Sequence, residues 1–320
     1  MALSALVKER YDAALKSGDL LFFPGDIKRK NAKGMEFEIT YAPALAEKPR
    51  LEMPQSEDGK KVKVNPFLPP NPALHVKDLD EHRVLLNKFC VTPHHILVVT
   101  KEFKMQTEPL LPPDLLATWQ CLTTAFESTS AVAFYNCGPF SGASQQHKHV
   151  QIMPLPNSGP QPPLRALFNE IQERKAGQIY ILEKLPFVHV ITPLDRDFIE
   201  SSPSTEHVED YLGQMFFGLL DNMFYQLRKH ATSYGREISY NFVMTPQFMM
   251  LVPRSKEIAV VHHNNQDIQL SINSLGFAGL LLVKSSDQLA ALEECPDLMD
   301  LLQQVAIPWN PSANDDELEQ

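Results

Sequence analysis

Two histidines and a glutamine alternate in the segment SQQHKHVQIM, residues 144–153. Successive side chains of a β-strand point to opposite faces, so His147, His149 and Gln151 should share one face while Val150 and Ile152 face the core. A neutral imidazole is a good nucleophile when one ring nitrogen is held so that the other points at the substrate. Two simpler alternatives are a half-exposed polar strand and a zinc site in which His-x-His supplies two ligands.

A turn of small residues leads into this segment. It contains Ser141, Gly142, Ala143 and Ser144, whose closely spaced backbone N–H groups can form an anion-binding concavity. Taken alone, the turn is typical of any tight loop. Beside the histidines it indicates attack on phosphorus, with Gln151 donating hydrogen bonds to a phosphoryl oxygen.

Composition narrows the class of protein. The 320 residues suffice for two domains or one duplicated domain, and 43% hydrophobic with 21% charged residues is typical of a folded chain. The net charge of −10 argues against a protein that binds nucleic acid, although a few lysines in a cleft can still hold phosphates. The four cysteines form no C-x-x-C pair, which favours a reducing compartment. Without a signal peptide or a membrane span, we expect a cytoplasmic location, with the nucleus as an alternative.

Hydrophobic periodicity predicts a mixture of helices and strands. A long loop is expected at 54–72, and we hypothesise that it covers the substrate. A final helix should begin at the capping box Ser285-x-x-Gln288. The other expected elements are helices at the N-terminus and at 113–129, 164–175 and 204–230, and strands at 37–42, 85–91, 95–100, 131–136, 144–153, 178–184, 187–193, 240–245 and 248–254.

A weak internal repeat is visible in the order of these elements. A helix precedes AVAFYN and HKHVQIMP in one half, and SYNFVM and QFMMLVP in the other. The second copy lacks the histidines, and we expect Met249 and Met250 to fill the corresponding place. The Pro-rich segment 154–163 is the candidate boundary. We therefore predict an N-terminal half at 1–160, a C-terminal half at 161–313 that contributes substrate contacts, and a frayed acidic tail at 314–320.

The segment His147–Met153 resembles the histidine-triad strand H-φ-H-φ-H-φ-φ, with Gln151 at the third histidine position. That substitution is typical of the nucleotidyltransferase branch of the superfamily. The chain resembles the fungal diadenosine tetraphosphate (Ap4A) phosphorylases, or ATP adenylyltransferases, in the segments NKFCVTPHHILVVT, YNCGPFSGASQQHKHVQIMP, SYNFVMT and INSLGFAGLLLVK. The resemblance implies an α+β, histidine-triad-like (HIT-like) fold with mainly antiparallel sheets flanked by helices, built of two halves of which the second is degenerate.

This resemblance also implies a reaction: reversible cleavage of Ap4A by inorganic phosphate to ATP and ADP, through a covalent AMP–histidine intermediate. The implied nucleophile is His149, with Gln151 steadying the α-phosphoryl oxygens and His147 orienting the nucleophile and assisting the leaving polyphosphate. No metal site or tightly bound cofactor is expected, although Mg²⁺ can accompany the polyphosphate. The implied substrate contacts are Lys48, Asn87, Lys88, Asn136, Ser141, Gly142, Ala143, Ser144, Gln151, Asn273, Ser274, Leu275 and Lys284.

Three rival interpretations stay open. A hexose-1-phosphate uridylyltransferase shares the H-x-H-x-Q strand and the duplication, but the absence of C-x-x-C ligands favours the adenylyl branch. A nucleotide-binding protein with an inactive site fits poorly with an intact strand. A zinc site would need further ligands, and the pairs His94-His95 and His262-His263 are expected in loops or on the surface, since adjacent strand residues point apart.

Overall fold

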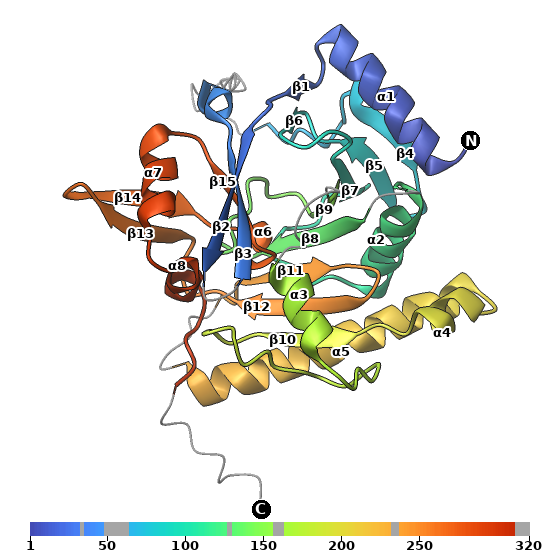
Figure 1. The fold of residues 1–320 in the computed structure, drawn as a ribbon. Helices are drawn as coiled ribbons and strands as arrows, with labels where there is room; N and C mark the ends of the chain where they lie inside the picture. Colours follow the sequence, from blue (N-terminus) through green and yellow to red (C-terminus); the bar gives the residue numbers. More distant parts are fainter. Residues whose placement is uncertain (33–34, 48–63, 127–129, 156–162, 232–236, 311–320) are drawn as a thin grey trace, which may run out of the picture.

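One antiparallel sheet of eight strands runs through the whole molecule (Figure 1). The computed structural model describes residues 1–32, 35–47, 64–126, 130–155, 163–231 and 237–310. Together with the helices, this sheet confirms the α+β class. In spatial order the strands are β10 (Val190–Pro193), β12 (Phe248–Pro253), β11 (Tyr240–Met244), β8 (Ala131–Cys137), β9 (His149–Pro154), β7 (Ile96–Thr100), β5 (His82–Leu86) and β4 (His75–Asp78).

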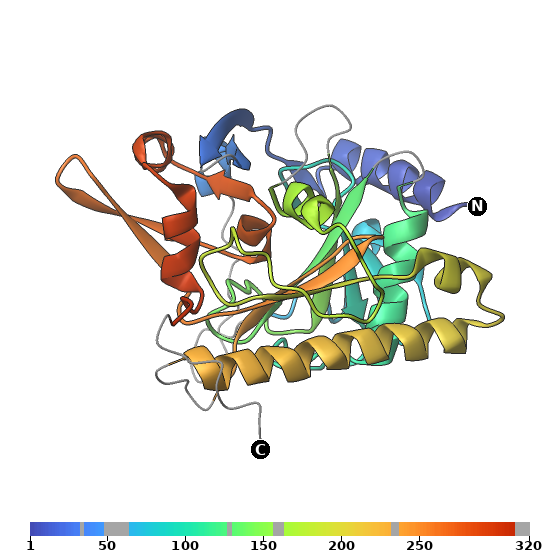
Figure 2. The ribbon, with the colours of Figure 1, turned by 60° about the horizontal axis from the view of Figure 1, so that its bottom comes forward.

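Three helices cover one face of the sheet: α1 (Leu3–Ser17), α2 (Pro112–Thr124) and α5 (Thr205–His230). The longest, α5, begins where the Ser204 side chain caps the His207 N–H, and it runs along the molecule in Figure 2. Its apolar residues recur with helical spacing and pack on α2 and β12. Val150 and Ile152 of β9 lie in the same core, so the alternate residues of β9 point to the opposite face.

The opposite face is covered over only part of the sheet. A second core joins Val243 and Met250 to Phe37 and Ile39 of a three-stranded sheet. No element of the described chain forms such a core over Gln151. The covering elements are β2 (Asp26–Ala32), β3 (Met35–Tyr41), β15 (Leu280–Val283), α3 (Pro163–Glu170), α6 (Ser274–Phe277), α7 (Ser286–Glu294) and α8 (Leu298–Val305).

Smaller elements complete the described chain. A two-stranded ribbon, β13 (Ile258–His263) and β14 (Gln266–Ser271), projects from the body in both views (Figures 1 and 2). None of the described helices is long and apolar enough to cross a membrane. The remaining elements are β1 (Leu21–Phe22), β6 (Phe89–Cys90), the short helix α4 (Arg196–Ser201) and the 3₁₀ helices η1 (Pro43–Glu47) and η2 (Pro72–Leu74).

The two predicted halves meet at the pair β8–β11, where Asn136 lies opposite Asn241. β9 flanks β8 as β12 flanks β11, and α2 packs on α5. The division at residue 160 stays a prediction, and residues 314–320 lie outside the described residues. Met249 and Met250 were both expected to fill the place of the histidines in the second half, and this is wrong for Met249. Adjacent strand residues point to opposite faces, so Met249 lies in the core under the helices, and only Met250 lies on the face of the sheet that carries His149.

Several predicted boundaries are wrong. The expected strand 85–91 is divided, because β5 ends at Leu86 and β6 pairs with β1 in parallel. Residues 178–184 form no named strand, since only Tyr180 makes a bridge, to Ile191. The Ser285 side chain caps α7 as expected, and the Gln288 side chain accepts from the Lys284 N–H at 2.9 Å. This helix is not the final one, however, because α8 follows it. The histidine strand begins at His149, five residues later than expected.

Candidate active site

His149 is the first residue of β9 and is 5% exposed. Its Nδ1 donates to the backbone carbonyl of His147 at 2.8 Å. A ring that donates through Nδ1 carries its lone pair on Nε2. Burial lowers the pKa of His149 to about 4, so the imidazole is neutral at pH 7. In the described part of the chain nothing is hydrogen-bonded to Nε2, which leaves this nitrogen for a ligand.

The backbone of His149 is held by Gln106, a residue that the sequence did not single out. The His149 N–H donates to Gln106 Oε1 at 2.9 Å. The Gln106 amide in turn donates to the carbonyl oxygens of Asn136, at 3.0 Å, and His149, at 3.3 Å. This side chain therefore ties the first residue of β9 to the end of β8. No local pattern marks Gln106, because its partners lie 30 and 43 residues away.

His147 has a different environment from the one expected. It lies before β9, in an isolated bridge with Met105, and is 2% exposed. Its Nδ1 accepts from Asn65 Nδ2 at 2.9 Å, so Nε2 carries the proton and donates to the carbonyl of Thr100 at 2.9 Å. Both ring nitrogens are thus occupied by protein groups, which leaves neither for zinc or for a leaving polyphosphate. The orientation of His149 depends on the His147 carbonyl rather than on its ring.

Lys148, the residue between the two histidines in the sequence, forms a buried ion pair with Asp114 of α2. Lys148 is 1% exposed, and its Nζ lies 2.6 Å from Asp114 Oδ2 and donates to the Pro109 carbonyl at 2.7 Å. His82 Nε2 lies 2.7 Å from the other Asp114 oxygen. Although burial alone raises the pKa of Asp114, the hydrogen bond from His82 and the charge of Lys148 lower it. The pair anchors the start of β9 to helix α2.

Two pockets meet at Gln151. The first, which we call the His149 pocket, has a volume of about 720 Å³. The second, the Glu38 pocket, has a volume of about 520 Å³. Leu45, Asn87, Phe89 and Gln151 line both pockets, so the two form one continuous cleft. A long ligand with two bulky ends could occupy both pockets and place its centre at Gln151.

His95 lies beside Gln151, in the loop directly before β7, so it is in a loop as one of the two expected positions but not at the surface. It is 8% exposed, and its Nδ1 accepts from Asn87 Nδ2 at 3.1 Å. Burial lowers the pKa of His95 to about 4, although the neighbouring Gln151 amide opposes this shift. Its Nε2 is buried without a well-formed hydrogen bond. His94 instead packs against Tyr11 in a tilted arrangement, with ring centroids 4.7 Å apart, whereas His262 is exposed as expected.

The Gly/Ser turn packs closely on the second half of the chain. Gly142 has a φ of 80°, and a Cβ there would lie 2.8 Å from the Ile272 carbonyl. Asn241 Nδ2 donates to the Ser141 carbonyl at 2.9 Å, and Ser141 is completely buried. Asn136 Oδ1 accepts from Asn241, and also from the backbone and hydroxyl of Ser274. Asn136, Ser141 and Ser274 therefore support the turn and do not face the cleft.

The other predicted contacts lie around the cleft. Asn87 lines both pockets, and Lys88 lines the His149 pocket with Ser144. Asn273 and Leu275 line the Glu38 pocket. A small adjoining pocket of about 280 Å³ is lined by Gly142, Ala143, Ser144, Asn273, Leu275 and Lys284, among others. Lys48 lies outside the described residues.

The predicted loop 54–72 contributes to the His149 pocket through the residues that the structure describes. The ring of Phe67 lies 5.2 Å from that of His149, centroid to centroid, and Phe67 packs on Leu97 and Val99. Residues 64–71 line the pocket, whereas 54–63 lie outside the described residues. Among the residues described, no group of three or more His, Cys, Asp or Glu side chains could hold a metal ion.

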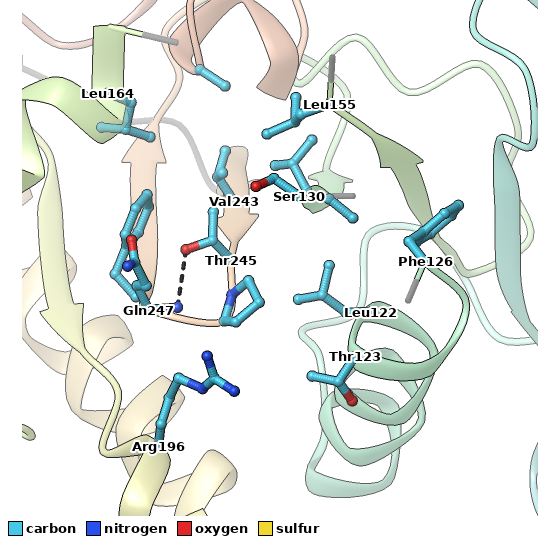
Figure 3. Close-up of a pocket in the computed structure, with 15 residues that line it drawn as sticks. Leu122, Thr123, Phe126, Ser130, Leu155, Leu164, Arg196, Val243, Thr245 and Gln247 are labelled. Carbon is cyan, nitrogen blue, oxygen red and sulfur yellow. Dashed lines mark hydrogen bonds between the residues drawn. The ribbon is translucent and has the colours of Figure 1, made fainter. Parts of the chain in front are cut away.

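A separate pocket of about 290 Å³ lies near the ends of α2 and β11 (Figure 3). Its polar lining includes Thr123, Ser130, Thr245, Gln247 and Arg196, and the backbone of Gln247 donates to Thr245 Oγ1 at 3.2 Å. No histidine or cysteine is among its described lining residues. Neither His147 nor His149 lines this pocket, whereas His149 lines the cleft around Gln151.

Comparisons with known proteins point to one family. Residues 1–170 match the family described as Ap4A phosphorylase N-terminal domain, and residues 183–308 match the ATP adenylyltransferase C-terminal domain. The chain is 32% identical to diadenosine 5',5'''-P1,P4-tetraphosphate phosphorylase 2 of Saccharomyces cerevisiae, over 93% of this chain and 92% of that protein. The crystal structure of yeast Ap4A phosphorylase Apa2 superposes with a TM-score of 0.79 at 28% identity, with both chains fully covered. Its complex with Ap4A gives 0.76 at 30% identity, over 96% of this chain and 99% of that chain.

Proposed function

The chain belongs to the family of Ap4A phosphorylases and ATP adenylyltransferases, and from that premise we propose that it cleaves Ap4A with inorganic phosphate to ATP and ADP. Family membership makes it an enzyme of the nucleotidyltransferase type. The observation that carries the proposal is His149. Its imidazole is buried and neutral, Nδ1 is fixed by the His147 carbonyl, and the residue lines a cleft of two pockets.

The proposed reaction has two steps. In the first, the Nε2 lone pair of His149 attacks the α-phosphorus, the bond from phosphorus to the bridging oxygen breaks, and ATP leaves with the bonding electrons. The proton stays on Nδ1, where its hydrogen bond to the His147 carbonyl stabilises the positive charge of the adenylylated ring. In the second, an unprotonated phosphate oxygen attacks the same phosphorus, the P–N bond breaks with its electrons returning to Nε2, and ADP forms, with any remaining phosphate proton released to solvent. Both steps are reversible in this scheme.

Gln151 would decide between phosphate and water as the acceptor. It lies at the junction of the two pockets, where its amide can donate to the phosphoryl oxygens but cannot remove a proton from water. The intermediate would therefore survive until phosphate enters. Asn87 and His95, which are hydrogen-bonded to each other beside Gln151, restrict the space available to its amide.

Charge on the departing polyphosphate needs a counter-charge. Lys88 lines the His149 pocket, and Lys284 lines the small pocket beneath the Gly/Ser turn. Residues 142–144 line the small pocket together with Lys284, and Ser144 also lines the His149 pocket together with Lys88. The backbone N–H groups of this turn could bind the phosphates as a nest. We propose no tightly bound cofactor; Mg²⁺ would enter with the polyphosphate. A cytoplasmic or nuclear location stays a prediction.

The test is incubation of the purified chain with Ap4A and phosphate, followed by separation of the nucleotides. We expect equal amounts of ATP and ADP that depend on phosphate, and no products with His149→Ala. Release of AMP without ADP would contradict the transferase assignment. Turnover of UDP-glucose with galactose 1-phosphate, and none of Ap4A, would favour the uridylyltransferase. Binding of Ap4A without any turnover would favour an inactive nucleotide-binding protein.

A further inference from the structure

A carboxylate lies inside the cleft that none of the proposed chemistry uses. In β3 the side chains alternate, so that Phe37 and Ile39 enter the second core while Glu38 and Thr40 line the Glu38 pocket. The side chain of Glu38 is only 9% exposed. Across the same pocket lie Gln151 and Met153 of β9. Glu38 is therefore a buried carboxylate that faces the ligand cleft.

Glu38 has little to neutralise its charge. Among the described residues, the cation nearest to it is Arg29, whose Nη2 lies 3.7 Å from Glu38 Oε1, too long for a hydrogen bond, and whose side chain is 43% exposed. Within the part of the chain that is described, no N–H or O–H group donates to this carboxylate. An ionised carboxylate can accept about four hydrogen bonds, and burying one without donors is unfavourable. The side chain thus has unused acceptor capacity directed at the pocket.

The chemistry of the carboxylate limits what it can bind. Phosphate groups are excluded at close range, because two negative charges repel strongly in a partly buried site. The rest of the lining is largely apolar and includes Ile27, Val91, Leu280 and Leu282, which suits a nucleoside. Within a nucleoside, the 2' and 3' hydroxyls of ribose form a pair of adjacent donors that matches the two carboxylate oxygens. Carboxylates bind ribose in this way in dinucleotide-binding folds.

We propose that Glu38 binds the ribose hydroxyls of one of the two nucleosides and so selects ribonucleotides over deoxyribonucleotides. The assignment rests on the proposed function, because it takes a dinucleoside polyphosphate as the ligand. It gives the Glu38 pocket a separate task from the His149 pocket: one recognises a sugar, and the other holds the nucleophile. Thr40, half-buried beside Glu38 on the same face, can accept or donate a further hydrogen bond to the sugar.

The test compares Ap4A with its analogues that lack the 2' or the 3' hydroxyl groups, in the unaltered enzyme and in Glu38→Gln. Glutamine keeps the size of the side chain but removes the charge and one acceptor. A hydrogen bond to a charged group corresponds to about a 10- to 100-fold change in affinity. We expect the deoxy analogues to raise KM by this factor in the unaltered enzyme, with a smaller change in kcat. Glu38→Gln should raise KM for Ap4A by a similar factor. In this variant, KM for the deoxy analogues should be close to KM for Ap4A.

The control is Asp26→Asn, which removes a carboxylate from the same small sheet. Asp26 is exposed at the start of β2 and does not line the pocket, so KM and the discrimination against deoxy analogues should stay as in the unaltered enzyme. Thermal unfolding checks the fold of both variants. Because the ion pair of Glu38 with Arg29 is long and partly exposed and does not offset the burial of the carboxylate, Glu38→Gln should melt at the same temperature or higher.

Two results would overturn the assignment. One is a Glu38→Gln enzyme that still rejects the deoxy analogues as strongly as the unaltered enzyme does. The other is a Glu38→Gln enzyme that loses discrimination between adenosine and inosine dinucleotides instead, which would place the carboxylate on the base. If the unaltered enzyme does not turn over Ap4A at all, the proposed function is contradicted. That outcome differs from the two above, which require an active unaltered enzyme.

Discussion

Asn241 Nδ2 donates to Asn136 Oδ1 at 2.9 Å, directly across the strand pair that joins the two predicted halves. The same amide nitrogen donates to the Ser141 carbonyl, and Arg254 Nη1 donates to Asn241 Oδ1. Burial lowers the pKa of Arg254 to about 9, which still leaves it charged at pH 7. Residues from the C-terminal half thus position the Gly/Ser turn, which lies in the N-terminal half.

Asn241→Ala should disturb that turn. The change removes the donor to Ser141 and the acceptor for Arg254, and each buried unsatisfied group costs about 1–3 kcal/mol of folding free energy. We expect a lower midpoint in denaturant and a raised KM for phosphate. Asn222→Ala is the control, since Asn222 makes a single bond to the Gly218 carbonyl within α5. Equal effects of the two changes on KM would contradict a role for Asn241 in the turn.

His149→Ala should abolish both turnover and covalent labelling by radiolabelled Ap4A. The other buried imidazole of the described cleft, His95, cannot replace it, because its Nδ1 lone pair accepts from Asn87 and its Nε2 carries the proton. His149→Gly should regain some activity when imidazole is added, since the small base can occupy the vacated space. A labelled adduct that persists in His149→Ala would move the nucleophile elsewhere.

His147→Ala should slow turnover and still allow labelling, because the carbonyl that binds His149 Nδ1 belongs to the backbone. The loss of the ring leaves the Thr100 carbonyl and the Asn65 amide without their partner, which should also lower stability. Peptide mapping and denaturant unfolding give the two readouts. Adenylylation of His147 itself would reverse the assigned roles.

Gln151→His should increase hydrolysis relative to phosphorolysis, because a group able to accept a proton returns beside the intermediate. The ratio of AMP to ADP at fixed phosphate is the measurement. Gln145→His places an imidazole in the same pocket but outside the strand, and should leave the ratio unchanged. If both variants, or neither, shift the ratio, Gln151 has no specific part in excluding water.

Acid should destabilise the protein between pH 6.5 and about 4. Burial lowers the pKa values of His95, His149 and His189 from 6.5 to about 4. In this window the unfolded chain binds more protons, so the free energy of unfolding falls as the pH falls, by roughly 3 kcal/mol for each histidine. Urea unfolding at pH 7, 5.5 and 4.5 measures the slope. His189→Gln removes one of these histidines and should reduce the slope; an unchanged slope would refute this account.

Asp114→Ala should destabilise the fold by about 3–5 kcal/mol, because it leaves the Lys148 ammonium buried without its partner. The double variant Asp114→Leu with Lys148→Met should recover much of that loss, since neither charge remains. Denaturant midpoints measure both effects. Additive losses in the double variant would show that the ion pair is not the source of the penalty.

Strand geometry alone was enough to separate His149 and Gln151 from Val150 and Ile152. Alternation is a property of the local backbone, and both apolar residues do lie in the helical core. The same reasoning located the N-terminal helix, the long helix at 204–230 and the strands 131–136 and 240–245. These elements have enough residues for their periodicity to be unambiguous.

Local reasoning failed where a partner distant in the chain decided the outcome. His147 was placed on the strand, but hydrogen bonds to Asn65 and Thr100, 82 and 47 residues away, hold it outside the sheet. His95 was expected in a loop or on the surface; it lies in the loop before β7 but is buried among residues that line the Glu38 pocket. A sequence window contains no information on which distant side chains will cover a given residue.

The sequence by itself therefore determined the family, the fold class and the fact that His149 and Gln151 face the cleft, because these depend on short motifs and on the alternation of side chains along a strand. The tertiary structure alone decided that Lys148 could be buried, since Asp114 on another element supplies its counter-charge. It alone turned Glu38, one charge among many in the sequence, into a buried acceptor in the cleft, since the core on one side of β3 directs Glu38 to the other. Burial and pairing of charges are properties of the packed chain, and they arise only when residues far apart in the sequence meet.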